Sequence, residues 1–595
     1  MAQSPLTEKA NLLSFRILVE GNEISGSYHD QVIEIRTEQD INQVGEAEII
    51  LRDGNPAKQD FPISDSDTFK PGNKIEIQMG YEGSNETVFK GMVLRMLLQV
   101  GDADGSRLKI HCREDSMKMT INRKNAIFLD QTDSSIMEQI ASDYSLSASV
   151  DSTSLTHKKM VQFYASDWDF VLKRAAANGL VVYMDSGELK VTKPQVSESP
   201  ELLLTYGKDI REFDCELDAT YQYSGVEAKS WSIENQALIS ATGESPGLNS
   251  QGNISSDSLS EALGVGTINR DSNAFLEQEG IQAWANASWL RSGLSRFQGT
   301  ISFQGSSLAK LNSLIQLEDL SERFNGNAYI SGVYQQIDHQ GWTTEVRIGL
   351  SPEWMEESGA PEAKASGLLP GVNGLQTGIV KKIDEDPDGE FRVQVEIPIL
   401  GAEGSAVWAR LATFYTGNSI GAYFMPELND EVVLGFMNDD PRYPIILGSV
   451  YSKSIAAPET PDADNTIKTI ITSSKLQLKF DDQNKVITLL TPGGNQAVLS
   501  DQDKGITLTD QNQNKITMND QGITIDSQSA INIKATDSIK MNAPTIELTG
   551  TESIKESAPS ISLSGDESVS VTGSGSCSVS SDGETSIKGS AVMIN

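Results

Sequence analysis

Residues 516–550 read ITMNDQGITIDSQSAINIKATDSIKMNAPTIELTG, a stretch in which two apolar residues flank any third residue and a polar interval follows. The first apolar residue of each unit recurs at steps of 7 or 8 residues: Ile516, Ile523, Ile531, Ile539, Ile546, Ile554, Ile561, Val569 and Cys577. Ile, Val and Thr are abundant, whereas apolar residues at helical spacing are missing. We therefore predict a repeat of one short strand and one turn, beginning near Leu476 and continuing to Asn595.

One such strand has a single narrow apolar face, which is too little to offset the entropy of ordering the strand alone. Stacked at about 4.8 Å per strand, some thirteen repeats would form a prism on the order of 60 Å long. Ile523, Ile525, Ile531 and Ile533 would fill its axis, and the polar residues would face water. We call one repeat unit an octad. One turn of the prism can be completed by three octads of one chain or by one octad from each of three chains, and the periodicity alone leaves both possibilities open.

The axial end of such a stack differs from its sides because the last strand leaves a row of backbone amides and carbonyls unpaired. In this chain the last strand is AVMIN, residues 591–595. We predict a capping partner at this tip, bound by Val592, Met593, Ile594 and Asn595.

Composition excludes several classes of function. The chain has 595 residues, which predicts three or more domains. Its 47 basic and 83 acidic residues give a formal net charge of −36, which would repel nucleic acid and anionic lipid. We expect no nucleic-acid binding. The N-terminal residues lack the basic and apolar regions of a signal peptide, so we expect the chain to begin in the cytoplasm. Three widely spaced cysteines argue against a disulfide framework or a four-cysteine zinc site.

Two helices and a small barrel are predicted upstream of the repeat. Residues 166–180 read as a helix that Ser166 caps, with Asp169 three positions on, and that Gly179 ends. A second helix is expected at 281–295. Five short runs separated by Gly, Pro and Asp turns favour a closed barrel, because closure removes unpaired strand edges: TGIVKKI (377–383), FRVQVEIPI (391–399), AVWARLA (406–412), GAYFMP (421–426) and DEVVLGFM (430–437).

Three local patterns resemble chemical sites but favour structural interpretations. GNSIG, residues 417–421, has the spacing of a nucleophile elbow around Ser419, but a Pro-interrupted, strand-like segment follows instead of a helix, so we expect a barrel loop. DEDPDG, residues 384–389, begins like a calcium loop but has Val395 at the twelfth position, so we expect a hairpin turn. The histidines are isolated from one another in the sequence. We predict no metal, no other cofactor and no catalytic residue.

The barrel segment carries the most specific motifs. They are DPDGEFRVQVEIP (386–398) and residues 407–452, with Trp408, Ala409, Arg410, Pro426, Glu427, Asp430 to Val432, Gly435, Phe436 and Asp440 to Gly448 as the matching positions. These motifs and the octad tail resemble VgrG proteins, the spikes of type VI secretion systems, and the central spikes of related phage-like contractile injection machines. FKPGNKIEIQMGY (69–81), VFKGMV (88–93) and residues 166–183 resemble the phage baseplate hub of these spikes.

The resemblance implies a mainly β fold. It has N-terminal α+β baseplate-hub-like domains, made of β-barrels with helices, at 1–355 and a linker at 356–374. An OB-fold neck follows at 375–453, a second linker at 454–470 and a trimeric β-helix needle at 471–595. The implied partners are two further copies of the chain, an Hcp-like inner tube protein, baseplate proteins, a PAAR-like tip protein and effectors. The spike would be assembled in the cytoplasm and delivered by contraction outside the cell or into target cells, crossing a membrane only by forced puncture.

Two departures from the family bear on enzymatic activity. About a dozen polar residues separate Tyr451 from the first repeats, which leaves no room for the lysozyme domain of phage relatives, and no fused effector is expected after the repeat. We therefore expect no enzymatic activity. The alternatives are a single-chain β-solenoid enzyme that degrades polysaccharides, for which the octads offer only scattered carboxylates, and an adhesin stalk, which would require export.

Overall fold

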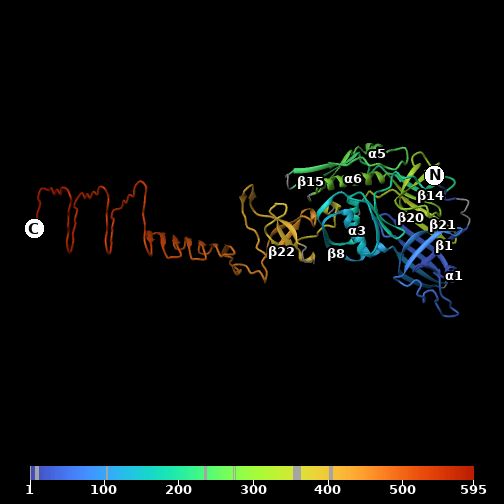
Figure 1. Cartoon of the computed structure of the whole chain (residues 1–595), viewed down its shortest axis with the longest axis horizontal. Coiled ribbons are helices and arrows are strands. Elements are labelled where there is room, and N and C mark those ends of the chain that lie inside the picture. The colour runs from blue at the N-terminus through green and yellow to red at the C-terminus, as the bar shows by residue number, and fades with distance from the viewer. Residues whose placement is uncertain are drawn as a thin grey trace. The chain divides into compact units, whose positions relative to one another are not determined.

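The computed structural model describes residues 2–6, 12–101, 105–232, 237–272, 274, 276–352, 364–400 and 406–594. It contains two compact units, Met1–Ala457 and Pro458–Asn595 (Figure 1). Strands are the main regular structure of both units, so the predicted mainly β fold is confirmed. None of the helices in the described ranges is long and apolar enough to cross a membrane.

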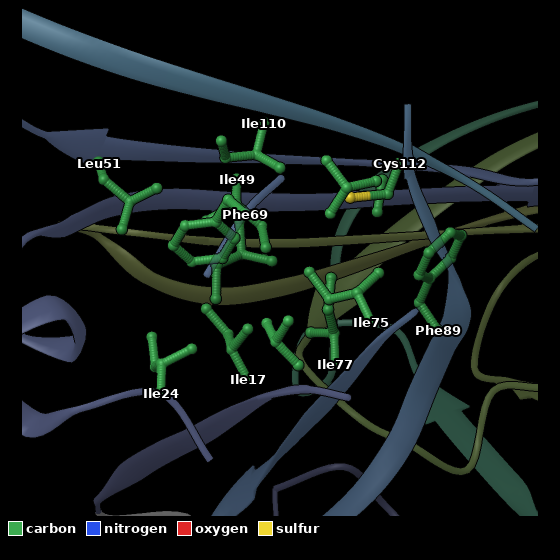
Figure 2. Close-up of a cluster of buried hydrophobic side chains, with 14 of the residues drawn as sticks. Ile17, Ile24, Ile49, Leu51, Phe69, Ile75, Ile77, Phe89, Ile110 and Cys112 are labelled. Carbon is green, nitrogen blue, oxygen red and sulfur yellow. The ribbon is translucent and has the colours of Figure 1, made fainter. Parts of the chain in front are cut away.

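A thirteen-stranded sheet forms most of the first unit. Its strand order is β14 (Ile210–Leu217), β18 (Phe297–Gln304), β21 (Gly341–Ile348), β20 (Gly326–Asp338), β3 (Val32–Asp40), β4 (Glu46–Arg52), β7 (Gly105–Arg113), β6 (Ser84–Gly101), β5 (Lys74–Tyr81), β1 (Leu13–Val19) and β2 (Asn22–Glu23), with β13 (Leu202–Thr205) paired to β19 (Ser313–Glu318), which joins β20. Side chains alternate along these strands, and the inward side chains pack into two apolar cores, one that includes Ile17, Ile49, Ile77 and Phe89 (Figure 2) and one that includes Ile301 of β18.

Smaller elements complete this unit. Three small sheets consist of β8 (Arg123–Thr132) with β10 (Thr156–Ser166), of β11 (Val181–Asp185), β12 (Glu188–Thr192) and β9 (Ser147–Val150), and of β16 (Ala237–Thr242), β15 (Gly225–Ser232) and β17 (Thr267–Ser272). The helices are α1 (Gly26–His29), α2 (Lys118–Ile121), α3 (Asp133–Asp143), α4 (Asp167–Ala177), α5 (Ser256–Leu263) and α6 (Gln278–Leu294), with short 3₁₀ turns at Asp115–Met117, Lys364–Gly367, Pro398–Leu400 and Met437–Asp439.

The two predicted helices are confirmed as α4 and α6. The Ser166 hydroxyl accepts a hydrogen bond from the Asp169 amide at 3.1 Å and donates one to the Asp169 carboxylate at 2.6 Å, which satisfies a free helix donor as predicted. Gly179 follows the helix in the left-handed conformation, with φ of 69°. In α6, Trp284 is buried, and Trp289 is half-buried.

The predicted five-stranded closed barrel is confirmed, with one strand placed wrongly. It consists of β22 (Gln376–Lys382), β23 (Val393–Glu396), β24 (Val407–Leu411), β28 (Pro444–Ser449) and β27 (Glu431–Phe436). The predicted strand at 421–426 is not formed: only β25 (Thr416–Gly417) and β26 (Ile420–Gly421) pair there, as a small hairpin outside the barrel. The closing strand is β28, which pairs in parallel with β24 and antiparallel with β27.

The end of the first expected linker is packed into the first unit. Residues 356–363 of this linker lie outside the described part of the chain. Leu368 enters the core beneath α6, Leu369 enters the core around α3 and α4, and Val372 enters the barrel core. Because three apolar side chains within five residues enter three cores, residues 364–372 attach the barrel to the rest of the unit.

The second unit begins with a seven-stranded antiparallel sheet, which we call the proximal sheet. Its strands are β29 (Ile467–Ile471), β30 (Gln477–Asp481), β31 (Val486–Leu490), β32 (Gln496–Ser500), β33 (Gly505–Thr509), β34 (Lys515–Asn519) and β35 (Gly522–Asp526). β29 starts inside the segment expected to be the second linker. Residues 527–594, which we call the distal segment, form no strand in one chain, so a strand in every repeat to the end is not found here (Figure 1).

Candidate functional site

The proximal sheet has one apolar face and one mostly polar face. Its register aligns two apolar ladders, Ile470, Leu478, Leu489, Ala497, Leu508, Ile516 and Ile525, and Phe480, Ile487, Leu499, Ile506, Met518 and Ile523. Residues two apart in a strand point to the same side, so both ladders lie on one face. The other face carries Thr469, Lys479, Thr488, Val498, Thr507, Thr517 and Thr524. Within the described ranges the side chains of this apolar face stay exposed or half-exposed, and Leu489 is 50% exposed.

The distal segment continues the apolar pattern without any cover. Its exposed apolar side chains are Ile531, Ile533, Ile539, Met541, Ile546, Leu548, Ile554, Ile561, Leu563, Val569, Val571, Val579, Ile587, Val592, Met593 and Ile594. No backbone-to-backbone hydrogen bond is formed among residues 529–594, all of which the structure describes. Unpaired strands with an uncovered apolar edge are templates for further chains.

The barrel carries an exposed apolar hairpin, which we call the neck hairpin, residues 412–426. It connects β24 to β27 and exposes Phe414, Tyr415, Ile420, Tyr423 and Phe424, with Phe414 89% exposed. Exposed aromatic residues gathered in one segment mark a contact surface between proteins more often than a free surface.

Ser419, the serine of the G-x-S-x-G pattern, lies in the turn of the neck hairpin. Its φ of 58° is that of a tight turn, and its hydroxyl donates to the Asn418 side chain at 3.4 Å. The preceding and following segments are two-residue strands, not a buried strand and a helix. The loop interpretation is confirmed, and the geometry does not fit a nucleophile.

The acidic turn at 384–389 holds an arginine where a calcium loop would hold its ion. The Arg392 guanidinium donates to Asp386 at 2.7 Å and to Asp388 at 2.6 Å, and it lies 3.5 Å from Glu390. Burial alone would raise the pKa of Asp386, but the Arg392 guanidinium and the backbone amides of Arg392 and Asp388, which donate to this carboxylate, lower it to about 2. Lys158 of β10 also reaches Asp388, at 2.7 Å. The predicted hairpin turn is confirmed, and its charge is balanced by side chains of the same chain.

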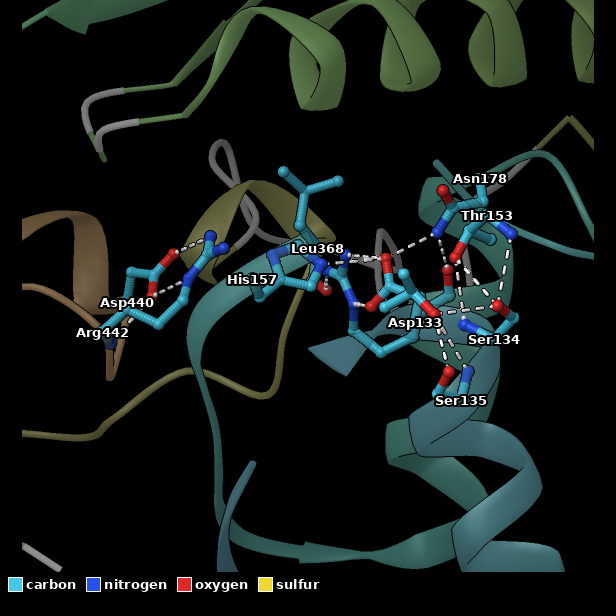
Figure 3. Close-up of polar contacts among 11 residues, drawn as sticks. Asp133, Ser134, Ser135, Thr153, His157, Asn178, Leu368, Asp440 and Arg442 are labelled. Carbon is cyan, nitrogen blue, oxygen red and sulfur yellow. Dashed lines mark hydrogen bonds and ion pairs between the residues drawn. The ribbon is translucent and has the colours of Figure 1, made fainter. Parts of the chain in front are cut away.

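A buried ionic network lies where the barrel meets α3 and α4. Arg174 of α4 donates to both carboxylate oxygens of Asp133, at 2.6 and 2.7 Å, and to the Leu368 carbonyl at 2.9 Å (Figure 3). His157 Nε2 lies 3.1 Å from Asp133. Burial would raise the pKa of Asp133, but Arg174 and His157 outweigh burial and hold this pKa well below its ordinary value. Asn178 donates a further bond to Asp133, at 2.9 Å.

On the barrel side of the network, Arg442 donates to both carboxylate oxygens of Asp440, at 3.0 and 2.8 Å. Asp440 is fully buried. Figure 3 shows Asp440 and Arg442 on the opposite side of His157 from Asp133. A cleft of 1670 Å³ borders the network and is lined by residues of both signs of charge, including Lys158, Glu277 and Arg410. The cost of removing such charges from water offsets much of their attraction, but loss of one partner leaves an uncompensated buried charge.

Known protein families match both the barrel and the repeat. Residues 376–451 match the family described as the type VI secretion system/phage-baseplate injector OB domain, and residues 486–575 match the phage baseplate V C-terminal trimerisation domain. Residues 9–339, more than half of the chain, match the Alg8 N-terminal domain. The chain belongs to the Alg8 N-terminal-domain family and is a VgrG-like spike protein. The expected resemblance to VgrG spikes is confirmed.

The relatives of this spike protein match it over a short segment. The type VI secretion system spike protein VgrG3 of Vibrio cholerae is 32% identical over 106 residues, which cover 16% of this chain and 10% of that protein. The spike protein VgrG4b of Pseudomonas aeruginosa is 32% identical over 104 residues, covering 16% and 13%. The chain thus spans about a tenth of the length of the curated relatives it matches. Another relative, 31% identical over 106 residues, is named actin cross-linking toxin VgrG1.

A solved structure shows the same fold. The lidded PdpA–VgrG complex of Francisella superposes with a TM-score of 0.51 at 12% identity, covering 88% of this chain and 81% of that one. At this identity the likeness concerns the fold alone.

The predicted tip residues of the spike protein stay a prediction. Val592, Met593 and Ile594 are exposed at the end of the distal segment, and Asn595 lies outside the described residues. Sequence reasoning missed the Asp133 network and the part that Arg392 plays. The cluster of carboxylates in the acidic turn indicated that a positive charge would lie there. In the structure this charge is the guanidinium of an arginine six residues after Asp386.

Proposed function

We propose that this spike protein acts as a homotrimer without enzymatic activity. Its first unit seats on the inner tube and baseplate, and its repeat pierces the target envelope while carrying a tip protein and effectors. Assembly takes place in the cytoplasm, and contraction delivers the spike outside the cell or into target cells. Because the chain is strongly acidic, membrane entry needs external force.

The observation that carries the proposal is the uncovered apolar face of the proximal sheet and its continuation in the distal segment. A face of this length, exposed in water, is unfavourable by about 25 cal/mol for every Å² that a partner would cover. Two further copies supply the same pattern at the same levels, so that Ile meets Ile along an axis. The neck hairpin adds an aromatic surface for the same copies, and the match to a trimerisation domain at 486–575 supports three chains.

The single-chain solenoid enzyme is less well supported. A solenoid needs successive turns of one chain to pair with each other, and residues 529–594 make no such pairs. The order of the domains is part of the proposal: a hub-like region at 1–355, an OB-fold neck at 375–453 and a needle at 471–595, with Val592 to Asn595 binding the tip protein.

The test is the mass of the full chain in solution. Native mass spectrometry and sedimentation should give three times the 64.5 kDa chain mass. Ile554→Asp should abolish the trimer because it places three carboxylates on the axis, whereas Lys555→Asp, the adjacent residue on the opposite face, should leave it intact. A stable particle of a single chain under native conditions would refute the homotrimer.

Piercing is tested separately, in a cell that fires the apparatus. Removing residues 527–595 should abolish delivery of the spike to the target while the first unit still binds the inner tube. Delivery at the level of the full chain would show that the distal segment is not needed to pierce.

A further inference from the structure

The two parts of the repeat differ in how much order one chain supplies. In the proximal sheet every inner strand pairs with both neighbours, and the turns close on themselves, with Thr491 N–H donating to the Asn495 carbonyl at 2.9 Å and Asp510 N–H to the Asn514 carbonyl at 3.0 Å. The distal segment has no backbone pairing of its own. One chain can therefore order the proximal sheet, whereas the distal segment needs other chains.

The distal repeats are also nearly interchangeable. Displacing one chain against another by one repeat would set Ile531 against Ile539, or Ile546 against Ile554, so apolar residues would still meet apolar residues. A register that rests only on repeating apolar positions is weakly specified.

The proximal sheet resists such a displacement. Its strands run antiparallel, so a shift by one strand would reverse the chain direction at every level. Two side chains also tie a turn of the chain to the segment two strands later. Asn495 Oδ1 accepts a bond from the Gln511 amide at 3.0 Å, and Asn514 Oδ1 accepts one from the Gln528 amide at 2.9 Å. The second tie reaches the first residues of the distal segment.

We propose that the proximal sheet sets the register of the spike: it orders first, and three distal segments then associate from Gln528 towards the tip. This inference rests on the proposed homotrimer and adds an order of assembly to it. The occupant of the uncovered distal surface is the same segment of two further copies. An in-register assembly places the three Cys577 side chains at one level, whereas a displaced chain places Cys577 elsewhere.

The experiment uses the full chain and Cys577 as a register reporter. Because Cys577 takes an axial position of the repeat, a small oxidant such as hydrogen peroxide should join the Cys577 thiols of two copies of the wild-type chain by a disulfide, and Cys577→Ser should remove this cross-link, since Cys112 is buried and Cys215 half-buried. In Asn495→Ala/Asn514→Ala the turn ties are lost, and we expect loss of most of the cross-link. The matched control is Gln511→Ala/Gln528→Ala, which keeps the ties because those residues donate through their backbone, and it should cross-link like the wild type.

A second measurement does not depend on the variants folding. In pulse-labelled hydrogen exchange during refolding, amides of 477–519 should gain protection at a rate independent of protein concentration, and amides of 531–594 should follow at a rate that rises with it. Simultaneous protection of both parts overturns the order of assembly. An unchanged cross-link in both the asparagine double variant and Thr488→Pro, which breaks β31, overturns the register role.

The remaining outcomes of the cross-linking and sedimentation experiments also distinguish between these hypotheses. Loss of the cross-link only in Thr488→Pro supports the sheet and removes the two asparagines from the mechanism. A wild-type chain that sediments as a single copy refutes the homotrimer itself, whereas a wild-type trimer that passes neither test refutes only the order and register proposed here.

Discussion

Asp133 is the residue whose loss should be felt most strongly in the first unit. Its carboxylate neutralises Arg174 and faces His157 in a site where all three side chains are buried. Asp133→Asn leaves the guanidinium without a counter-charge, which typically costs about 3 to 5 kcal/mol. We expect a large drop in the thermal unfolding midpoint of the first unit, followed by scanning calorimetry. Asp130→Asn, an exposed position on the neighbouring strand, should leave the midpoint unchanged.

The same residue predicts sensitivity to acid. Because the folded pKa of Asp133 is lowered, the stability it contributes is present above the unfolded pKa of about 4 and is lost as pH falls through the folded pKa. In Asp133→Asn this part of the acid sensitivity should disappear. A variant whose stability falls between pH 4 and 2 as steeply as that of the wild type would contradict the assignment.

Glu114 should act in the opposite direction. Its burial raises its pKa to about 7, although Gln39 and the Gly45 amide donate to it at 2.7 Å each. In the unfolded chain Glu114 releases its proton at about pH 4.3. Between that pH and 7 the folded state therefore holds more protons than the unfolded state. The free energy of unfolding falls as pH rises across this window, by an amount on the order of 3 kcal/mol. Glu114→Gln should flatten this slope, and the exposed Glu86→Gln should not. Thermal unfolding midpoints of both variants and the wild type, measured from pH 4 to 8, test this prediction.

Whether the sequence predicts the contact of a single residue depends on how far apart the two partners lie along the chain. Ser166 and Asp169 are three residues apart, so the cap was predictable from the local pattern. Asp440 and Arg442 are two residues apart within the recognised motif. Asp133 and Arg174 are 41 residues apart, and only the packing of α3 on α4 brings them together. No periodicity or motif records such a contact.

At the scale of elements, the barrel shows what alternation can and cannot predict. Residues 421–426 are a short apolar run of the kind found in a buried strand, but Pro426 and the exposed Tyr423 and Phe424 do not pair with a neighbour. The true closing strand, β28, begins with a proline that lies at its first residue, where no ladder bond is lost. Its parallel pairing with β24 depends on closure of the whole barrel, which a local pattern does not contain.

The acidic turn of the barrel predicts that added calcium has no effect. Arg392 fills the place between Asp386, Asp388 and Glu390, so millimolar calcium should leave the unfolding midpoint of the wild-type chain unchanged. Arg392→Gln should cost about 1.5 to 3 kcal/mol, the range for hydrogen bonds to charged groups. Lys381→Gln, which breaks the half-exposed pair with Glu396, should cost at most about 1 kcal/mol. Stabilisation of the wild type by calcium would contradict the structural reading of this turn.

For the whole molecule, the sequence predicted the apolar repeat but left the number of chains open. The structure sharpens the question because one chain pairs its own strands to Asp526 and no further. The step between strand starts also changes, from 9 or 10 residues in β29 to β34 to 7 residues at β35. This difference in step length was not read from the sequence, because the same I-x-I pattern runs through both parts and only the turns differ.

The tip yields the last prediction. In a trimer the final strands leave open backbone groups beside Val592 and Ile594, so the purified chain without a tip protein should associate end to end into pairs of trimers. A net charge of −36 per chain opposes this association, and salt screens charges over about 8 Å at physiological ionic strength, so the pairs should increase with salt. Ile594→Asp should suppress them without changing the trimer, whereas Lys588→Gln, which changes the charge by the same amount, should not. Sedimentation velocity at several concentrations measures the effect, and trimers that stay single at every concentration and salt would show that the tip is closed by the chain itself.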